Sequence, residues 1–244
     1  MACQLEVIAF NIESCITIER CGAHRIELCM NPEEGGTTPS YGFIRSAREK
    51  VSIELFPIIR PRGGSFYYSD DEFEMMKEDV RLCKELGCDG VVLGLLEMDS
   101  QVDIQRTRRL VDLAYPLEVT FHRAFDRVQD HQQALEDVIA CGCTRILTSG
   151  LRPTAEEGVD ILKELIEQAD SRIVIMPGSG VRASNILSIA EVTGAQEFHT
   201  SARTSTSRVE SRNRLFPENF QYVIADSAEI VDCIEKLSSI AMER

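Results

Sequence analysis

The stretch Thr120-Phe121-His122-Arg123-Ala124-Phe125-Asp126 (TFHRAFD) decides the fold, because it ends an expected β-strand in three chemically active side chains. The apolar, β-prone run LEVTF leads into it, and a helical pattern begins near Asp130. His122, Arg123 and Asp126 therefore lie where a strand gives way to a helix. Parallel α/β folds place their active sites at such positions, at the carboxyl ends of strands.

The same alternation of strand and helix patterns extends along the whole chain and indicates a closed barrel. We expect strands at 4–8, 25–29, 53–59, 90–93, 117–121, 145–148, 172–176 and 197–199, and helices at 12–21, 40–49, 71–86, 103–114, 131–140, 155–168, 182–190 and 227–241. Eight such units favour a single (β/α)8 TIM-type barrel domain over residues 1–244. The alternative is an open doubly wound sheet, but its usual glycine-rich first loop is missing from AFNIES (9–14).

Composition and charge narrow the classes of function. The formal net charge of −14 argues against nucleic-acid or anionic-membrane binding that is independent of sequence. No run approaches the roughly 18 apolar residues of a membrane span, and the start MACQLEVIAF does not resemble a signal peptide. Nine scattered cysteines, an odd number, argue against a disulfide framework. We therefore expect a cytoplasmic protein.

Polar side chains inside the expected strands point to a ligand pocket. Alternation along a strand puts Glu27 on the same face as Cys29, and His199 on the same face as Ser201. A barrel interior built only for stability would carry Val, Ile and Leu there. The sequence predicts catalytic or ligand-binding roles for Glu27, Arg60, His122, Asp126 and His199, with Glu6 and Glu27 in a supporting layer. A purely structural layer of ion pairs is the alternative.

Two loops are candidate anion sites. Gly178, Ser179 and Gly180 follow the seventh expected strand, and Ser201 and Arg203 follow the eighth, which is where barrel enzymes often hold phosphate. Arginines after the third and fifth strands add further positive charge: Arg60, Arg62 and Arg123. Tight turns that need glycine and a solvated arginine loop are the structural alternatives. We expect the partner of these residues to be a small anionic ligand.

The scarce residue types exclude some mechanisms. The five lysines lie in expected helices or at their ends, which argues against a Schiff-base aldolase. Only two of the four histidines, His122 and His199, are expected at the mouth, whereas a catalytic zinc site usually has three protein ligands. Cu(I) prefers thiolate or thioether ligands, and Cys29 is the one cysteine at the carboxyl end of an expected strand. Cys29 is therefore the candidate metal ligand, with packing as a small apolar residue as its alternative.

Seven motifs together strongly resemble the copper homeostasis protein CutC family: RIELC (25–29), EGGTTPS (34–40), IRPRGG (59–64), TFHRAFD (120–126), RILTSG (145–150), PGSGV (177–181) and EFHTSA (197–202). The resemblance implies a TIM-type barrel, a cytosolic homo-oligomer (dimer or tetramer) and a role in copper handling. It also implies a Cu(I) ligand at Cys29. A second proposed family cysteine is replaced here by Ile8, and Ser65 replaces an acidic residue of the family.

Three functions stay open at this point. The family resemblance favours copper homeostasis, with copper as the bound metal and weak Cu(I) binding, because the chain has one strand-end thiol. The residues alone favour an enzyme acting on a small anionic or phosphorylated metabolite by acid–base chemistry at the barrel mouth. A scaffold without catalysis is the third possibility. Whether the chain is an enzyme is not decided by its sequence.

Overall fold

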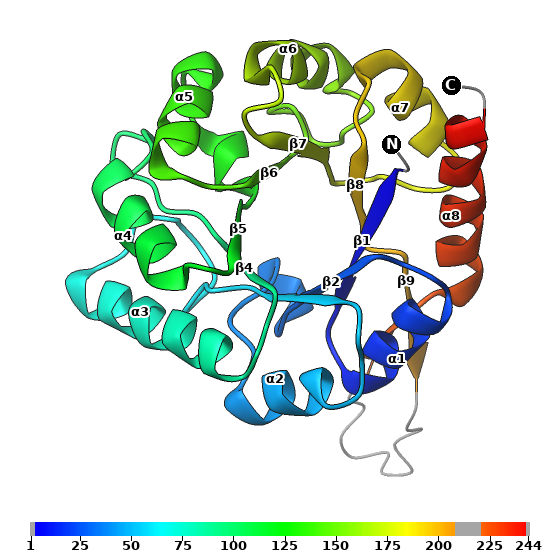
Figure 1. Cartoon of the computed structure of the whole chain (residues 1–244), viewed down its shortest axis with the longest axis horizontal. Coiled ribbons are helices and arrows are strands. Elements are labelled where there is room, and N and C mark those ends of the chain that lie inside the picture. The colour runs from blue at the N-terminus through cyan, green and yellow to red at the C-terminus, as the bar shows by residue number, and fades with distance from the viewer. Residues whose placement is uncertain (1–2, 208–220, 243–244) are drawn as a thin grey trace, which may run out of the picture.

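In the computed structural model, which describes residues 3–207 and 221–242, eight parallel strands form a ring surrounded by helices (Figure 1). The eight units, in chain order, are β1 (Gln4–Ala9) and α1 (Ile12–Arg20), β2 (Arg25–Leu28) and α2 (Tyr41–Arg48), β3 (Glu54–Pro57) and α3 (Asp70–Glu85), β4 (Gly90–Leu93) and α4 (Ile104–Ala114), β5 (Glu118–Phe121) and α5 (His131–Cys141), β6 (Arg145–Thr148) and α6 (Val159–Ala169), β7 (Val174–Pro177) and α7 (Ile186–Thr193), β8 (Glu197–Thr200) and α8 (Ser227–Met242). The predicted (β/α)8 TIM-type barrel is confirmed.

The strands pair in chain order around the ring. Parallel ladders join β8, β1, β2 and β3, and further ladders join β4, β5, β6 and β7. A parallel bridge between Ile58 and Val92 links β3 to β4, and β7 lies beside β8 (Figure 1). The carboxyl ends of all these strands therefore meet at one end of the barrel, which is the geometry on which the predicted site depends.

Local sequence signals explain where most helices begin and end. Ser69 caps α3 through the backbone N–H of Glu72, whose side chain accepts a hydrogen bond from the Ser69 N–H in return. Gly142 and Gly194 end α5 and α7 with φ values of 87° and 75°, the left-handed conformation that glycine adopts readily after a helix. Two helices begin later than predicted: α6 at Val159, instead of residue 155, and α7 at Ile186, instead of residue 182.

The sequence patterns did not predict a hairpin after β8. After β8 the chain forms an antiparallel hairpin, β9 (Arg203–Ser207) and β10 (Gln221–Ala225), before it enters α8. The hairpin is anchored to α1: the Asn11 side-chain amide donates to the Val223 carbonyl over 2.7 Å, and the Ala225 N–H donates to the Ser14 hydroxyl over 3.0 Å. It therefore occupies the place after β8 where many barrels continue directly into their last helix.

Two apolar clusters divide the core. The larger one fills the space between strands and helices, and contains Leu5, Val7, Ile26, Leu55 and Phe121 among many others. The smaller one lies inside the barrel and consists of Cys29, Phe56, Ile58 and Val92. All nine cysteines lie in the described part of the chain, and eight of them pack in or against the larger cluster. Cys29 is therefore the one thiol of the barrel interior.

Charged residues fill the amino-terminal end of the barrel. Arg25 pairs with Glu54 at 2.9 Å and Glu197 at 2.9 Å, and Arg145 pairs with Glu197 at 2.6 Å. Both guanidinium groups lie over the ring of Phe56, at 4.8 and 5.6 Å from its centroid. Both arginines are buried, so the pairing and the aromatic contacts offset their loss of hydration. A structural ion-pair layer thus exists, one layer below the predicted site.

Candidate functional site in the barrel interior

Four interior side chains form a continuous row across β8, β1 and β2. The register pairs Glu6 with His199, which brings these two side chains together inside the ring. His199 Nδ1 lies 2.7 Å from a Glu6 oxygen, and His199 Nε2 lies 3.8 Å from a Glu27 oxygen. The Cys29 thiol lies next to Glu27, whose charge helps to raise the thiol pKa. The row therefore runs Glu6–His199–Glu27–Cys29: ligand atoms of the first three residues lie within 4.8 Å of one another, and the thiol lies at the end of the row beside Glu27.

Burial and mutual charge set the protonation of this row. Burial opposes ionisation of Glu6, but the hydrogen bond and charge of His199, together with Arg25 and Arg145, lower the pKa of Glu6 to about 2. Burial raises the pKa of Glu27 to about 7 against the opposing charge of His199. The hydrogen bond to Glu6 and the charge of Glu27 raise the pKa of His199 despite its burial. Glu6 is thus a fixed anion, which stabilises a proton on His199 Nδ1.

Glu6, Glu27 and His199 could hold a metal ion, because one ligand atom from each lies within 4.8 Å of the others. The predicted division into an upper site with His199 and a lower layer with Glu6 and Glu27 is therefore not what the structure shows. The reason is register: His199 lies at mid-strand beside Glu6, within the barrel instead of at its mouth. Burial, followed by the charges of Glu27 and Glu6, raises the pKa of the adjacent Cys29 thiol well above its usual value.

His122 has different surroundings from those expected. Its Nδ1 accepts a hydrogen bond from the Ala124 N–H over 3.1 Å, and its ring lies 4.9 Å from the ring of Phe66. Burial and the charge of Arg60 lower the pKa of His122 to about 3, so the ring is neutral. Neither of the candidate carboxylates, Asp126 and Glu27, hydrogen-bonds to His122: Glu27 faces His199, and Asp126 binds the next loop.

Asp126 connects the carboxyl ends of β5 and β6 through hydrogen bonds. Its carboxylate accepts hydrogen bonds from the Thr148 hydroxyl over 2.5 Å and from the Ser149 N–H over 3.0 Å. Arg123 donates to the same carboxylate over 2.7 Å and to the Ser149 hydroxyl over 3.0 Å. The two residues fix the mouth between β5 and β6. A catalytic role for Asp126 and an anion-binding role for Arg123 stay predictions.

Arg60 and Arg62 bind mainly the protein's own loops. Arg60 donates to the carbonyl oxygens of Glu34, Gly36 and Gly64 over 2.6, 2.8 and 3.0 Å. Arg62 pairs with Glu72 over 2.5 Å and also donates to loop carbonyls. The Arg60 contacts hold the loops after β2 and β3 against each other, whereas Arg62 is engaged by α3 and by its own loop. Their ligand-binding roles stay predictions.

The predicted phosphate loops lie beside each other but differ from a helix-terminal phosphate site. Ser179 and Gly180 have φ values of 74° and 72°, and the Ser179 hydroxyl donates to the Pro153 carbonyl over 2.8 Å. Because α7 begins at Ile186, its N-terminus lies several residues beyond these glycines. A side chain at Gly178 would overlap Leu147 and approach His199, so close packing also requires this glycine. Arg203 is exposed and lies over Phe10. Roles for Ser201 and Arg203 in binding an anion stay predictions.

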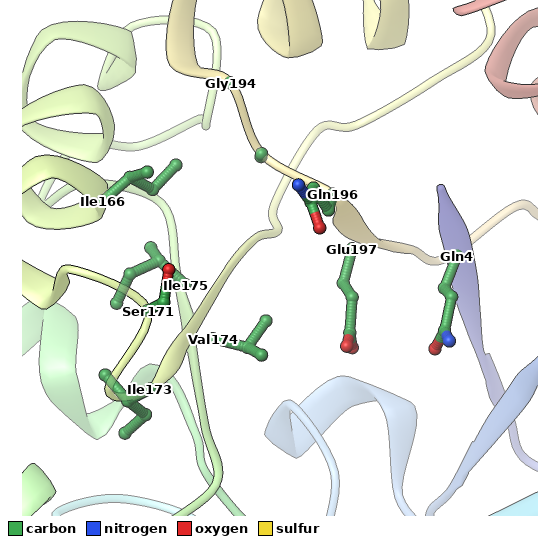
Figure 2. Close-up of a pocket in the computed structure, with 10 residues that line it drawn as sticks. Gln4, Ile166, Ser171, Ile173, Val174, Ile175, Gly194, Gln196 and Glu197 are labelled. Atoms are coloured by element: carbon green, nitrogen blue, oxygen red, sulfur yellow. The ribbon is translucent and has the colours of Figure 1, made fainter. Parts of the chain in front are cut away.

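Two pockets open at opposite ends of the barrel. At the carboxyl end, a pocket of about 600 Å³ lies among the loops after β2 to β5, with Arg60, Arg123 and Arg127 in its lining. At the amino end, a pocket of about 620 Å³ lies between α6, β7 and β8. Figure 2 shows Gln4 and Glu197 extending side by side into this second pocket, with isoleucines of α6 and β7 opposite. Its carboxylate, Glu197, is already paired with Arg25 and Arg145.

Sequence reasoning missed one contributor to the mouth, Arg127. The aromatic residues that follow the arginine loop, Phe66, Tyr67 and Tyr68, suggest a lid or an interface from sequence, and Phe66 and Tyr67 do line the mouth pocket. Arg127 ends the short helix η2 (Arg123–Arg127), which no periodicity predicts. No helix in the described ranges is long and apolar enough to cross a bilayer.

Comparison with known proteins decides the family. The family model described as "CutC family" matches residues 3–204. The chain belongs to the CutC family. A family protein CutC of Chromobacterium violaceum is 55% identical over 199 residues, covering 82% of this chain and 81% of that protein. The human copper homeostasis protein cutC homolog is 49% identical over 210 residues, covering 86% and 77% of the two chains. The structure of a CutC from Streptococcus agalactiae superposes with a TM-score of 0.77 at 36% identity, covering 82% and 98%.

Proposed function

We propose that this CutC-family chain serves copper homeostasis by binding a copper ion inside the barrel, between His199, Glu27 and Cys29. The name of the human relative, a copper homeostasis protein cutC homolog, supports the choice of metal. The observation that carries the location is the row Glu6–His199–Glu27–Cys29, which brings the one interior thiol to a carboxylate that faces an imidazole.

The donor set fits copper as follows. Glu6 accepts the Nδ1 proton of His199, which leaves Nε2 as the free ligand atom facing Glu27. The 3.8 Å between Nε2 and the Glu27 oxygen accommodates an ion with bonds of about 2 Å, the length known for imidazole and carboxylate ligands of zinc. Imidazole suits copper, and thiolate suits Cu(I) in particular. A single thiol with a raised pKa must lose its proton, so we expect weak binding.

The test is a competition titration of metal-free protein against a chromophoric Cu(I) chelator under reducing conditions. We expect one equivalent of copper per chain, bound more weakly than by a two-thiolate site. Cys29→Ser and His199→Gln should each abolish this binding. Cys15→Ser is the matched control, because Cys15 is equally buried but packs outside the barrel.

Two results would contradict the proposal. One is an absence of copper binding by the unaltered protein at chelator concentrations that detect micromolar affinity. The other is copper binding that survives in Cys29→Ser but is lost on substitution of Cys83, which lies next to Cys88 on the outer side of the barrel. That outcome would show that copper binds at Cys83 and Cys88 instead of inside the barrel.

A further inference from the structure

Two buried hydrogen-bond donors at the barrel mouth lack an acceptor within hydrogen-bond distance, although the Tyr68 hydroxyl lies near Arg60. Among the described residues, Arg60 Nε and His122 Nε2 are buried side-chain atoms without a hydrogen bond. The side chains are well enclosed, since Arg60 is 5% and His122 4% exposed. The ring of Phe66 contacts both: its centroid lies 5.0 Å from the Arg60 guanidinium carbon and 4.9 Å from the His122 ring centroid. Unpaired buried donors are uncommon in folded proteins and mark a place for a missing acceptor.

The chemistry of both atoms requires an acceptor. His122 Nδ1 already accepts from the Ala124 N–H, so the proton of the neutral ring sits on Nε2. Arg60 Nε carries a proton at all relevant pH values, and the other two guanidinium nitrogens are occupied by backbone carbonyls. An oxygen atom of a ligand can accept from such donors, and the positive charge of Arg60 favours an anion.

The adjacent pocket of about 600 Å³ adds charge and apolar surface to these donors. Arg127 lines it, is exposed, and makes no hydrogen bond or ion pair within the part of the chain that the structure describes. Arg123 also lines it and keeps 42% of its side chain exposed. Glu34 and Glu97 lie in the same lining, so positive charge exceeds negative charge there by one. The remaining wall includes the apolar and aromatic side chains of Phe66, Tyr67, Leu96 and Met98.

We propose that this mouth pocket binds a small organic oxyanion, with an oxyanion group held by Arg127 and Arg123 and an apolar part packed against Phe66 and Tyr67. When the Phe66 ring turns aside, an oxygen of the ligand accepts from His122 Nε2 and Arg60 Nε. The site is distinct from the Glu6–His199–Glu27–Cys29 row, and its failure would leave the copper proposal untouched. A carboxylate and a phosphate ester share this chemistry, and the experiment separates them.

The test is calorimetric titration of the full chain with three probes at matched ionic strength: benzoate, phenyl phosphate and inorganic phosphate. We expect at least one aromatic probe to bind more tightly than inorganic phosphate, because only the aromatic probes use the apolar wall. The tighter of the two identifies the headgroup. Arg127→Gln should weaken that probe about ten-fold, as expected for loss of a charged hydrogen bond. Arg20→Gln, an exposed arginine on α1, is the control and should bind as the unaltered protein does.

A second pair of variants tests the buried donor. His122→Leu removes the Nε2 donor and should weaken the aromatic probe, whereas His122→Gln keeps a side-chain N–H and should retain part of the affinity. Thermal unfolding establishes that each variant is folded. Equal binding by the unaltered protein, Arg127→Gln and His122→Leu would overturn the proposal. So would inorganic phosphate binding as tightly as both aromatic probes, or no binding of any probe at millimolar concentration.

Discussion

At the residue scale, Glu27 is a carboxyl group whose pKa rises strongly on folding. It lies in the barrel with 4% exposure, and burial raises its pKa to about 7, above the 4.5 of an unperturbed glutamate. A carboxyl group with a raised pKa binds its proton more tightly in the folded state. Its contribution to stability is therefore present below pH 4.5 and is lost as the pH rises through about 7.

The substitution Glu27→Gln, made in metal-free protein, tests this sign. Glutamine resembles the protonated carboxyl group, so the variant should lack the loss of stability that the unaltered protein undergoes between pH 5 and pH 8, a range chosen to bracket about 7. We expect the free energy of unfolding of the variant, relative to the unaltered protein, to rise by about 2 kcal/mol across this range. Urea unfolding at each pH measures it. A difference that stays constant, or that falls with pH, would show that Glu27 is ionised in the folded state.

At the element scale, the charged layer at the amino ends of β2, β6 and β8 connects these strands by ion pairs at the amino end of the barrel. Arg145 donates to Glu197, Glu118 and Thr120, and so connects strands on different sides of the ring. The Arg145 and Arg25 guanidinium groups both pack over the Phe56 ring, which gives each cation an aromatic contact. The layer is a structural feature, because its buried arginines are paired with carboxylates of neighbouring strands.

Arg145→Ala should reveal the energy of this layer. The substitution removes a buried cation and leaves its carboxylate partners undercompensated, so we expect a loss of about 3 kcal/mol in the free energy of unfolding. Arg172→Ala is the matched control, because Arg172 forms a comparable bidentate pair with Glu136 on the exposed surface. That pair should contribute far less to stability, because water screens it. Chemical denaturation of both variants measures the contrast, and similar losses would mean that the buried layer is not specially stabilising.

Sequence patterns predicted most elements, but not every boundary. Short β-branched runs mark the eight strands, because each strand is buried between the interior and the helices. Helix α6 begins late because Gly158 packs against Ser149, where a side chain would overlap the Ser149 carbonyl oxygen. The hairpin was not predicted, because its two strands are separated by a long connection instead of a short turn. The alternating RTSTS (203–207) is only a weak strand signal.

The sequence predicted which residues face the barrel interior, but not which of them contact each other. Parity along the strands correctly put Glu27, Cys29 and His199 inside the barrel, since alternation follows directly from strand geometry. The partnership of His199 with Glu6 depends on the register between β1 and β8, which residue patterns in one strand do not encode. The occupation of Arg60 by loop carbonyls likewise depends on the path of two loops.

At the scale of the whole molecule, the barrel separates three layers along its axis. Paired charges lie at the amino end, the row Glu6–His199–Glu27–Cys29 lies in the middle, and the loop pocket with Arg123 and Arg127 lies at the carboxyl end. This order is that of barrels in general, which use one end for stability and the other for ligands. The proposed copper ion belongs to the middle layer and the proposed oxyanion to the mouth.

The location of copper is the central claim, and one measurement tests it most directly. Crystals of the full chain grown with one equivalent of copper under reducing conditions can be measured above and below the copper absorption edge. We predict a single anomalous-difference peak inside the barrel, within bonding distance of His199 Nε2, a Glu27 oxygen and Cys29 Sγ. A peak at any other group of residues, such as Cys83 and Cys88 on the outer side of the barrel, would contradict this account, as would the absence of any peak.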